Sequence, residues 1–435
     1  MYRFTVAFLV IIFLCFFNPV LAIQDSNPEA GNIAALMEDS RVDSAFSHLE
    51  DMREINNERL IAITEIPAPP FAEEARAADI AARMQALGLD DVEIDAAGNV
   101  IGIRAGLADE TGNRIAIVAH LDTVFPAGTD VTVRREGDVF YAPGIGDNSR
   151  GLVALLSLIE TLEANDLQTD RTLMFVASSG EEGLGDLRGV RHLMASQGDA
   201  IGSFIAIDGG EAHRLVTTAV GSMRYRVTFR GTGGHSYAAF GRAHPHQALA
   251  EAITRFVTAA TPLTTDGVKA TFSVGRIEGG TSVNSIPFES AMEVDMRSAD
   301  QDKLNALQTA FLASVNEALE VENGRMRDGE PLTVDIETIG DRPAGRNDPN
   351  SPLVRHAIAA LAARGIEAEL VESSTDSNIA ISMGIPAVTI SRGGISNDAH
   401  SPQESWEDVD AHIALQSALL LLLAEAGLTA PASGD

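Results

Sequence analysis

The feature that most constrains the fold is an alternation of apolar strand-like runs with amphipathic helix-like segments along most of the chain. Strand-like runs cover residues 100–104, 114–119, 172–177, 203–207 and 387–391, and helix-like segments cover 71–87, 151–163, 188–196 and 352–363. Strands buried on both faces are apolar throughout, and parallel neighbours need helical crossovers. The pattern therefore predicts an α/β fold, with a mostly parallel sheet flanked by helices.

The middle of the chain breaks this alternation. It reads strand, helix, strand, strand, helix, strand over residues 222–230, 245–259, 270–277, 290–297, 299–319 and 332–338. That order predicts a ferredoxin-like α+β unit. Because the α/β pattern returns near Pro352, we expect a large domain in two parts, residues 23–220 and 341–435, with a smaller domain inserted at 221–340. Residues 25–45 are polar and Ala-rich, and we expect a linker there that runs into a first helix.

The first 22 residues differ in character from the rest of the chain. Arg3 is their only charge, and residues 4–17 are almost wholly apolar before Val20-Leu21-Ala22. This pattern predicts a signal peptide at residues 1–22, cut after Ala22, and so a periplasmic or secreted protein. A permanent anchor is the alternative, but the apolar run is shorter than the roughly 20 residues that span a bilayer. We expect no stable membrane insertion after cleavage.

Cysteine and charge exclude several classes of site. Cys15 is the only cysteine and lies in that leader, so a metal site in the mature chain would use His and carboxylate ligands. The formal net charge of −31 argues against nucleic acid or an anionic membrane as a partner, and we read it simply as a source of solubility.

Five candidate metal-binding segments lie far apart in the sequence, and four of them come at or shortly after the end of an expected strand. They contain His120, Asp147, the pair Glu181-Glu182, Asp208 and His400. Ligands bind outside the carboxyl ends of the strands in open α/β sheets. We therefore expect these side chains to converge on one edge of the sheet.

Their residue types suit a dinuclear site, with zinc favoured and cobalt or manganese as alternatives. Two metals about 3.5–4 Å apart need a bridging carboxylate and an activated water, and a hydrolase needs a further carboxylate that accepts a proton. Glu181 and Glu182 are adjacent and can divide the roles of base and ligand. Asp122 points to the same side as His120 in an extended segment and can hold the His120 ring.

Each of these signals has a structural alternative when it is taken alone. A His-x-Asp pair arises by chance, and paired Glu residues often begin a solvated helix. Asp147 before a helix is often an N-cap, and His400 alone is often a loop histidine. The prediction depends on five such elements, in order, at one expected edge.

Five segments together resemble the M20 metallopeptidase family, which holds tripeptidases, dipeptidases, carboxypeptidases and N-acyl-amino-acid deacylases. They are residues 118–126 (VAHLDTVFP), 143–151 (PGIGDNSRG), 179–185 (SGEEGLG), 205–208 (IAID) and 397–401 (NDAHS). The resemblance covers nearly all of the mature chain. It implies a zinc-peptidase-like catalytic domain with the inserted domain as its lid.

The resemblance implies roles for the matching residues. The family's zinc ligands match Asp147 as the bridge, His120 and Asp208 at one position, and Glu182 and His400 at the other. Glu181 would be the general base, and Asp122 would orient His120. Many relatives have Asp-Asp or Asp-Lys where this chain has Asp147-Asn148, but the bridging position is intact.

The lid carries part of the resemblance. Gly233-Gly234-His235-Ser236 resembles the lid motif whose His polarises the scissile carbonyl, often from a partner subunit, since an oxyanion needs a donor opposite the zinc ions. A plain loop histidine is the alternative. Asn284 looks like a lid residue that contacts substrate. Arg297 could bind a substrate carboxylate or form an ordinary surface ion pair. The resemblance also implies a homodimer formed through the lid.

The expected activity follows from the branch of the family. Asp at position 208, together with residues 181–189 and 374–378, resembles the tripeptidase-like (peptidase T-like) branch. We expect an exported dinuclear zinc hydrolase that cleaves amide bonds in short peptides with a free amino end. The alternative is an N-acyl-amino-acid deacylase or carboxypeptidase of the same family. A non-catalytic binder would have lost the base or a ligand, and an acidic membrane-anchored scaffold has no positive feature in its favour.

Overall fold

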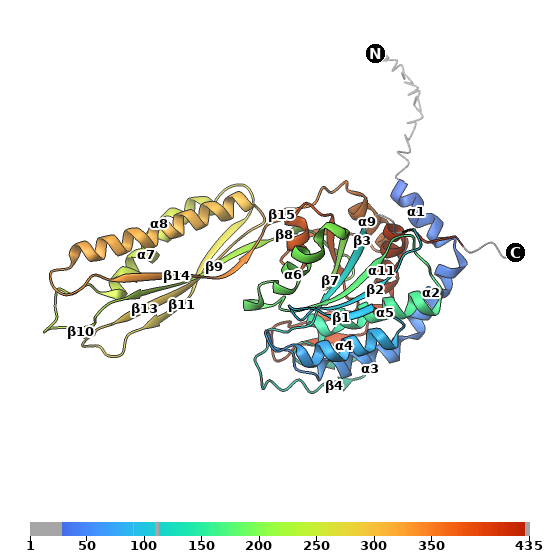
Figure 1. The fold of residues 1–435 in the computed structure, drawn as a ribbon, viewed down its shortest axis with the longest axis horizontal. Coiled ribbons are helices and arrows are strands. Elements are labelled where there is room, and N and C mark those ends of the chain that lie inside the picture. Colours follow the sequence, from blue (N-terminus) through green and yellow to red (C-terminus); the bar gives the residue numbers. More distant parts are fainter. Residues whose placement is uncertain (1–27, 90, 109–112, 431–435) are drawn as a thin grey trace, which may run out of the picture.

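The computed structural model describes residues 28–89, 91–108 and 113–430, which form two lobes joined at a narrow waist (Figure 1). The larger lobe holds the two ends of the described chain. The smaller lobe, the lid, holds the middle, from β9 (Gly221–Arg230) to β14 (Thr333–Arg342). No helix in these described ranges is long and apolar enough to cross a membrane. The expected signal peptide lies outside the described residues.

The larger lobe is built on a nine-stranded sheet. Its order is β1 (Asp91–Ile94), β2 (Val100–Arg104), β6 (Leu173–Ser178), β3 (Arg114–His120), β7 (Ile201–Gly209), β17 (Ala387–Ser391), β8 (Arg214–Ala219) and β15 (Gly345–Arg346), with β16 (Glu369–Ser373) also paired to β8. The central strands β6, β3, β7 and β17 run parallel, which confirms the expected sheet. β1, β2 and β15 pair antiparallel, a direction that a short apolar run does not reveal.

Helices cover both faces of this sheet, and each central strand divides its side chains between them. Ile115 and Ile117 of β3 pack in the core formed with α4 (Glu74–Ala86), α5 (Gly151–Ala164), α9 (Pro352–Ala363) and α11 (Ala411–Ala426). Ala116 and Val118 pack on the other face with α6 (Arg188–Gln197) and α10 (Ser377–Ser382). Burial on both faces is the reason these strands are continuously apolar.

The expectation of a linker over residues 25–45 is wrong for the described part of that segment. The chain forms α1 (Pro28–Met37) and α2 (Ser40–Asp51), followed by α3 (Arg53–Thr64). Ile33 and Phe46 from the first two helices are buried in the main core. The segment looked polar because only one face of each helix is apolar. That face is buried in the main core of the larger lobe.

The lid is an antiparallel four-stranded sheet in the order β11 (Ala270–Gly279), β13 (Glu289–Ser298), β9, β14. Helices α7 (Pro245–Ala260) and α8 (Gln301–Arg325) pack against it, and their apolar residues share one core with the strands. The chain order β9, α7, β11, β13, α8, β14 confirms the expected ferredoxin-like unit. At the far end of the lid, β10 (Gly234–His235) pairs with β12 (Ser285–Ile286) (Figure 1).

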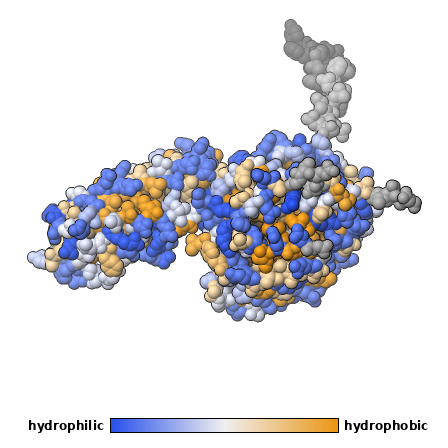
Figure 2. All heavy atoms as spheres, viewed as in Figure 1, coloured by the Kyte–Doolittle hydropathy of each residue, from blue (hydrophilic) through white to orange (hydrophobic). Residues whose placement is uncertain are grey.

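A small sheet supports two loops of the larger lobe. It has the order β18 (Ile395–Asn397), β19 (Ser405–Glu407), β5 (Val139–Tyr141), β4 (Arg134–Glu136). The pairing of β19 with β5 brings the loop after β18 close to the turn that precedes α5. On the face drawn in Figure 2, hydrophilic residues predominate and apolar residues gather in patches on both lobes.

Candidate metal centre

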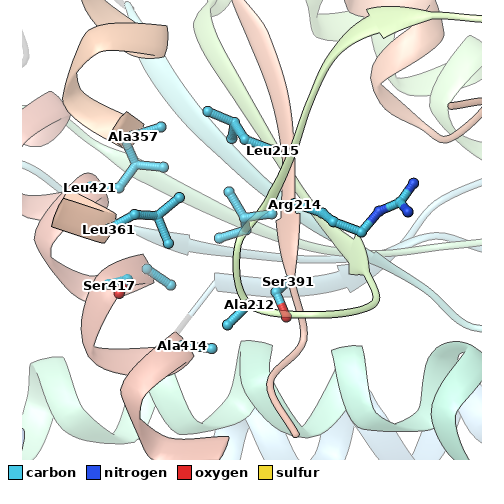
Figure 3. Close-up of a pocket in the computed structure, with 11 residues that line it drawn as sticks. Ala212, Arg214, Leu215, Ala357, Leu361, Ser391, Ala414, Ser417 and Leu421 are labelled. Carbon is cyan, nitrogen blue, oxygen red and sulfur yellow. The ribbon is translucent and has the colours of Figure 1, made fainter. Parts of the chain in front are cut away.

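A cleft of about 520 Å³ combines residues of the larger lobe and the lid. Its lining is Val124, Asp147, Glu181, Glu182, Gly183, Asp208, Arg224, Arg297, Arg342, Ser373, Ser374, Thr375 and His400. A second cavity, of about 20 Å³, lies between β8, β17, α9 and α11 (Figure 3). Its lining is mainly apolar and includes no His, Asp or Glu, so the cleft is the candidate site.

The candidate ligands reach the cleft because the strands that carry them are neighbours. His120 ends β3, Asp208 lies near the end of β7, and the Glu181-Glu182 pair closely follows β6. These strands run parallel and side by side, so their carboxyl ends share one edge. Asp147 lies in the short turn before α5, and His400 lies in the loop between β18 and β19.

The five expected ligands meet in two groups that share one carboxylate. In the first, His120 Nε2 lies 3.2 Å from Asp147 Oδ1 and 3.6 Å from Asp208 Oδ1. In the second, His400 Nε2 lies 3.2 Å from Asp147 Oδ2 and 2.9 Å from Glu182 Oε1. The ligand atoms of each group all lie within 4.8 Å of one another. Asp147 therefore presents one oxygen to each group, as a bridging carboxylate does.

The donor chemistry of these groups fits a pair of divalent metal ions. Two imidazoles and three carboxylates, with no thiolate, suit zinc, manganese or cobalt. A carboxylate shared between two such groups suits ions about 3.5–4 Å apart. His120 and Asp147 would hold the ions with little reorganisation, since His120 is 1% exposed and already in contact with the bridge.

Glu181 differs from Glu182 in its partners. Its Oε1 accepts a hydrogen bond from Arg342 Nη1 at 3.0 Å, whereas Glu182 faces His400. Burial, together with the charge of Glu182, raises the pKa of Glu181 well above its ordinary value, despite Arg342. The ligand atoms of His120, Glu181 and Glu182 also lie within 4.8 Å of one another. Glu181 is therefore close to the candidate ligands, and what distinguishes it is its hydrogen bond with Arg342.

Asp122 contacts both the His120 ring and the loop that carries Glu181 and Glu182. Its carboxylate accepts the backbone N–H groups of Glu181 and Glu182 at 2.9 and 2.8 Å. The Nδ1 atom of His120 lies 3.0 Å from the Asp122 carbonyl oxygen and 3.6 Å from the Asp122 carboxylate. The closer partner of the ring is therefore the carbonyl, and the carboxylate mainly fixes the glutamate loop.

Arg392 is a buried cation that the sequence reasoning missed. Its Nη1 lies 3.0 Å from Asp147 Oδ1 and 3.4 Å from Asp208 Oδ1. Burial alone would raise the pKa of Asp147, but Arg392, His120 and His400 hold it well below its ordinary value. An ion in the first group would share these two oxygens with the guanidinium.

Glu404 is a second residue that the sequence reasoning missed. It is fully buried, and its carboxylate accepts backbone N–H groups of Gly144 (2.8 Å), Gly146 (2.9 Å) and Asp147 (2.8 Å). Burial raises its pKa to about 7 against the effect of these bonds. Glu404 thereby ties the loop that carries His400 to the turn that carries Asp147. Only its position four residues after His400 marks it in the sequence, and that spacing alone has no unique meaning.

The expected lid residues are divided between two places. Arg297 lines the cleft, together with Arg224. His235 and Asn284 are exposed at the far tip, where the Ser236 N–H donates to the Asn284 carbonyl oxygen (Figure 1). Within one chain, His235 and Asn284 are therefore not brought to the metal cluster.

The model of peptidase family M20/M25/M40 matches residues 116–426. The uncharacterised protein YqjE of Bacillus subtilis (strain 168) is 26% identical over 310 residues, which cover 70% of this chain and 78% of YqjE. Carboxypeptidase G2 of Pseudomonas sp. (strain RS-16) is 26% identical over 163 residues, 36% of this chain and 39% of that enzyme.

Solved structures share the fold. The aminopeptidase PepT of Bacillus cereus superposes with a TM-score of 0.66 at 22% identity, covering 86% of this chain and 97% of PepT. The YXEP protein of Bacillus subtilis, a dinuclear metal binding peptidase, superposes with a TM-score of 0.62 at 16% identity, covering 87% of this chain and 99% of that one.

Proposed function

The chain belongs to peptidase family M20/M25/M40 and is a metallopeptidase, and from that premise we propose that it is an exported dinuclear zinc enzyme that removes residues from the free amino end of short peptides. One observation carries the proposal. Five side chains from distant segments meet in two groups that share Asp147, in a cleft that also holds the carboxylate of Glu181.

The residues of the cleft divide the chemistry among them. The two ions, when bound, supply Lewis acidity to the scissile carbonyl and acidify the attacking water. Glu181 takes the proton of that water and returns it to the leaving amine. Arg342 holds the Glu181 carboxylate in place, and Asp122 fixes the loop on which it lies. Asp147 offers one carboxylate oxygen to each of the two metal positions.

The oxyanion donor of this mechanism is His235, acting from a second copy of the chain. His235 lies on the β10–β12 ribbon at the far end of the lid from its own metal cluster (Figure 1). Around that tip, Tyr237 is 88% exposed, Phe240 76% and Val283 103%. Exposed aromatic and aliphatic side chains favour contact with another protein surface. We propose a homodimer formed through the lid, in which His235 and Asn284 reach the partner's cleft.

The choice of peptide substrate is supported by Asp208 and by the fold shared with the aminopeptidase PepT. The local match to carboxypeptidase G2 favours the second candidate, a carboxypeptidase or N-acyl-amino-acid deacylase. Both would use the same metal cluster and base. They differ in whether the substrate keeps a free amino group.

The deciding experiment compares a free tripeptide with an N-acetyl amino acid as substrates of the zinc-loaded protein, with and without a chelator. Cleavage of the tripeptide from its amino end, lost on chelation and restored by zinc, is the expected result. Cleavage of the acetyl compound alone would assign the deacylase reaction instead. Parallel reloading with cobalt or manganese measures which metal supports the highest rate.

Export is proposed from the leader at residues 1–22. Arg3, the apolar run and Val20-Leu21-Ala22 have the order of a cleavable signal. Sequencing the amino end of the protein recovered from the periplasm or medium should give Ile23 first. Recovery of the intact leader in a carbonate-washed membrane fraction would favour the anchor.

A further inference from the structure

We propose that the cleft selects peptides whose C-terminal residue is acidic, so that the substrate offers two carboxylates, one from the chain end and one from the side chain. This inference rests on the proposed function, because it names the substrate class of the same site.

The wall that remains for substrate carries three arginines. Apart from the metal cluster and Glu181, the lining consists of Arg224, Arg297, Arg342, three hydroxyl residues at 373–375, Val124 and Gly183. It contains no aromatic residue and no aliphatic side chain larger than valine. A site for large apolar residues would bury them against apolar walls. This wall instead matches a small, polar, anionic group.

Two of the arginines form a built pair on the lid. Asp295 of β13 accepts the Nε–H of Arg224 at 2.9 Å and the Nε–H of Arg297 at 2.8 Å. Arg224 lies directly opposite Asp295 in the β9–β13 register, and Arg297 is two residues further along β13, on the same face. Asp295 therefore holds both guanidinium groups through their Nε atoms.

The charges of this pair are not balanced by its own aspartate. Asp295 is one carboxylate between two guanidinium groups. Arg224 also donates from Nη1 to the Gly183 carbonyl oxygen at 3.1 Å, which leaves its Nη2. Among the described residues, Asp295 is the only hydrogen-bond or ion-pair partner found for Arg297. Arg342 is occupied by Glu181 and Asp186.

A peptide with a neutral C-terminal side chain offers one carboxylate to this pair. Arg297 alone can bind that group through its free nitrogens, which leaves the charge of Arg224 unmatched in the cleft. A second carboxylate, on the side chain of the last residue, pairs with Arg224. Guanidinium–carboxylate hydrogen bonds are among the stronger ones, so the preference is expected to be large.

The test compares Gly-Gly-Glu with Gly-Gly-Gln, which have nearly the same size and differ in charge. For the wild-type enzyme, kcat/KM should be roughly 10- to 100-fold higher for the Glu peptide, the range expected for a hydrogen bond to a charged group. Arg224→Met should bring that ratio to about one. Arg224→Lys, which keeps the charge, should retain part of it.

The matched control is Arg230→Met. Arg230 lies on the same strand but away from the cleft, where it is paired with Glu289. Its removal should leave the ratio at the wild-type value. A wild-type ratio near one, or a ratio that survives Arg224→Met, would overturn the inference while the peptidase function stands. Hydrolysis of neither peptide by the zinc-loaded enzyme would overturn the proposed function, and the inference with it.

Discussion

The metal cluster and the tip of the lid are built in opposite ways. In the cluster, His120 is 1% exposed and Asp122 is fully buried, and each is held by partners from another segment. At the tip, His235 is exposed on a two-residue strand, and its Nδ1 accepts only the nearby N–H groups of Tyr237 and Ala238, at 3.2 and 3.4 Å. The cluster is buried and held by contacts between distant segments, whereas the tip is exposed and held by local hydrogen bonds.

The metal cluster is assembled within a single chain, whereas His235 of the same chain lies apart from it. Groups that bind metal and move protons gain from fixed geometry, because they then need no reorganisation during the reaction. A donor for the oxyanion is required only once substrate is in place, so it can approach on a separate element. Four predictions test this contrast, and the largest effects belong to the buried cluster.

Glu181→Gln should cause the largest loss. It removes the proton acceptor but leaves a side chain that Arg342 can still hold, so kcat should fall by roughly 10²- to 10⁴-fold. Metal content, measured on the purified protein, should stay at the wild-type stoichiometry. The matched variant Glu182→Gln should lose metal as well as activity. If Glu181→Gln kept the wild-type rate, Glu181 would not be the base.

His235→Ala should cost about 10²- to 10³-fold in kcat if His235 supplies the oxyanion donor. Mixing this variant with Glu181→Gln then separates the two halves of the site. Random exchange of subunits gives mixed dimers with one intact site each, and about a quarter of the wild-type activity should return. No recovery after exchange, verified by separating tagged dimers, would show that each lid serves its own chain.

Glu404→Gln should have an intermediate effect. The amide has one acceptor oxygen in place of two for the three backbone N–H groups of the Asp147 turn, so the turn and His400 lose their fixed relation. Metal affinity should fall by about 10- to 100-fold, as for other groups that orient ligands. Competition with a calibrated chelator measures it. Glu407→Gln, nearby on β19, is the control and should match wild type.

Tyr237→Ser should have the smallest effect on the fold. The side chain is 88% exposed, so the free energy of unfolding should change by less than about 0.5 kcal/mol. The same change should weaken self-association, measured by sedimentation, because it removes apolar surface from the lid tip. Unchanged association would place the dimer contact elsewhere.

The parts of the site that the sequence predicted are those attached to strand ends. His120, Asp208 and the glutamate pair follow apolar runs, and the parallel order of β3, β6 and β7 brings them to one edge. The lid could also be predicted, because the hydrophobic periodicity of its strands and helices depends on the lid's own core and not on where the lid lies relative to the larger lobe. The local sequence pattern is sufficient to predict a site residue when a single strand or helix determines where that residue lies.

The parts that the sequence did not predict depend on contacts between distant segments. Arg392 reaches Asp147 and Asp208 only after β17 has entered the sheet. Glu404 needs three N–H groups of a turn far away in the chain. Likewise α1 is apolar on one face only, and no local signal shows which surface that face will meet.

The place of β17 in the sheet has a consequence for biosynthesis. This strand lies between β7 and β8, although it is made after the whole lid. Until it arrives, β7 has an unpaired side, and the chain lacks Arg392, His400 and Glu404, which follow it. A nascent chain already carries Glu181 and four of the five candidate ligands, but the second group still lacks His400. The metal cluster is therefore complete only after synthesis has passed His400, nine residues beyond the end of β17 at Ser391.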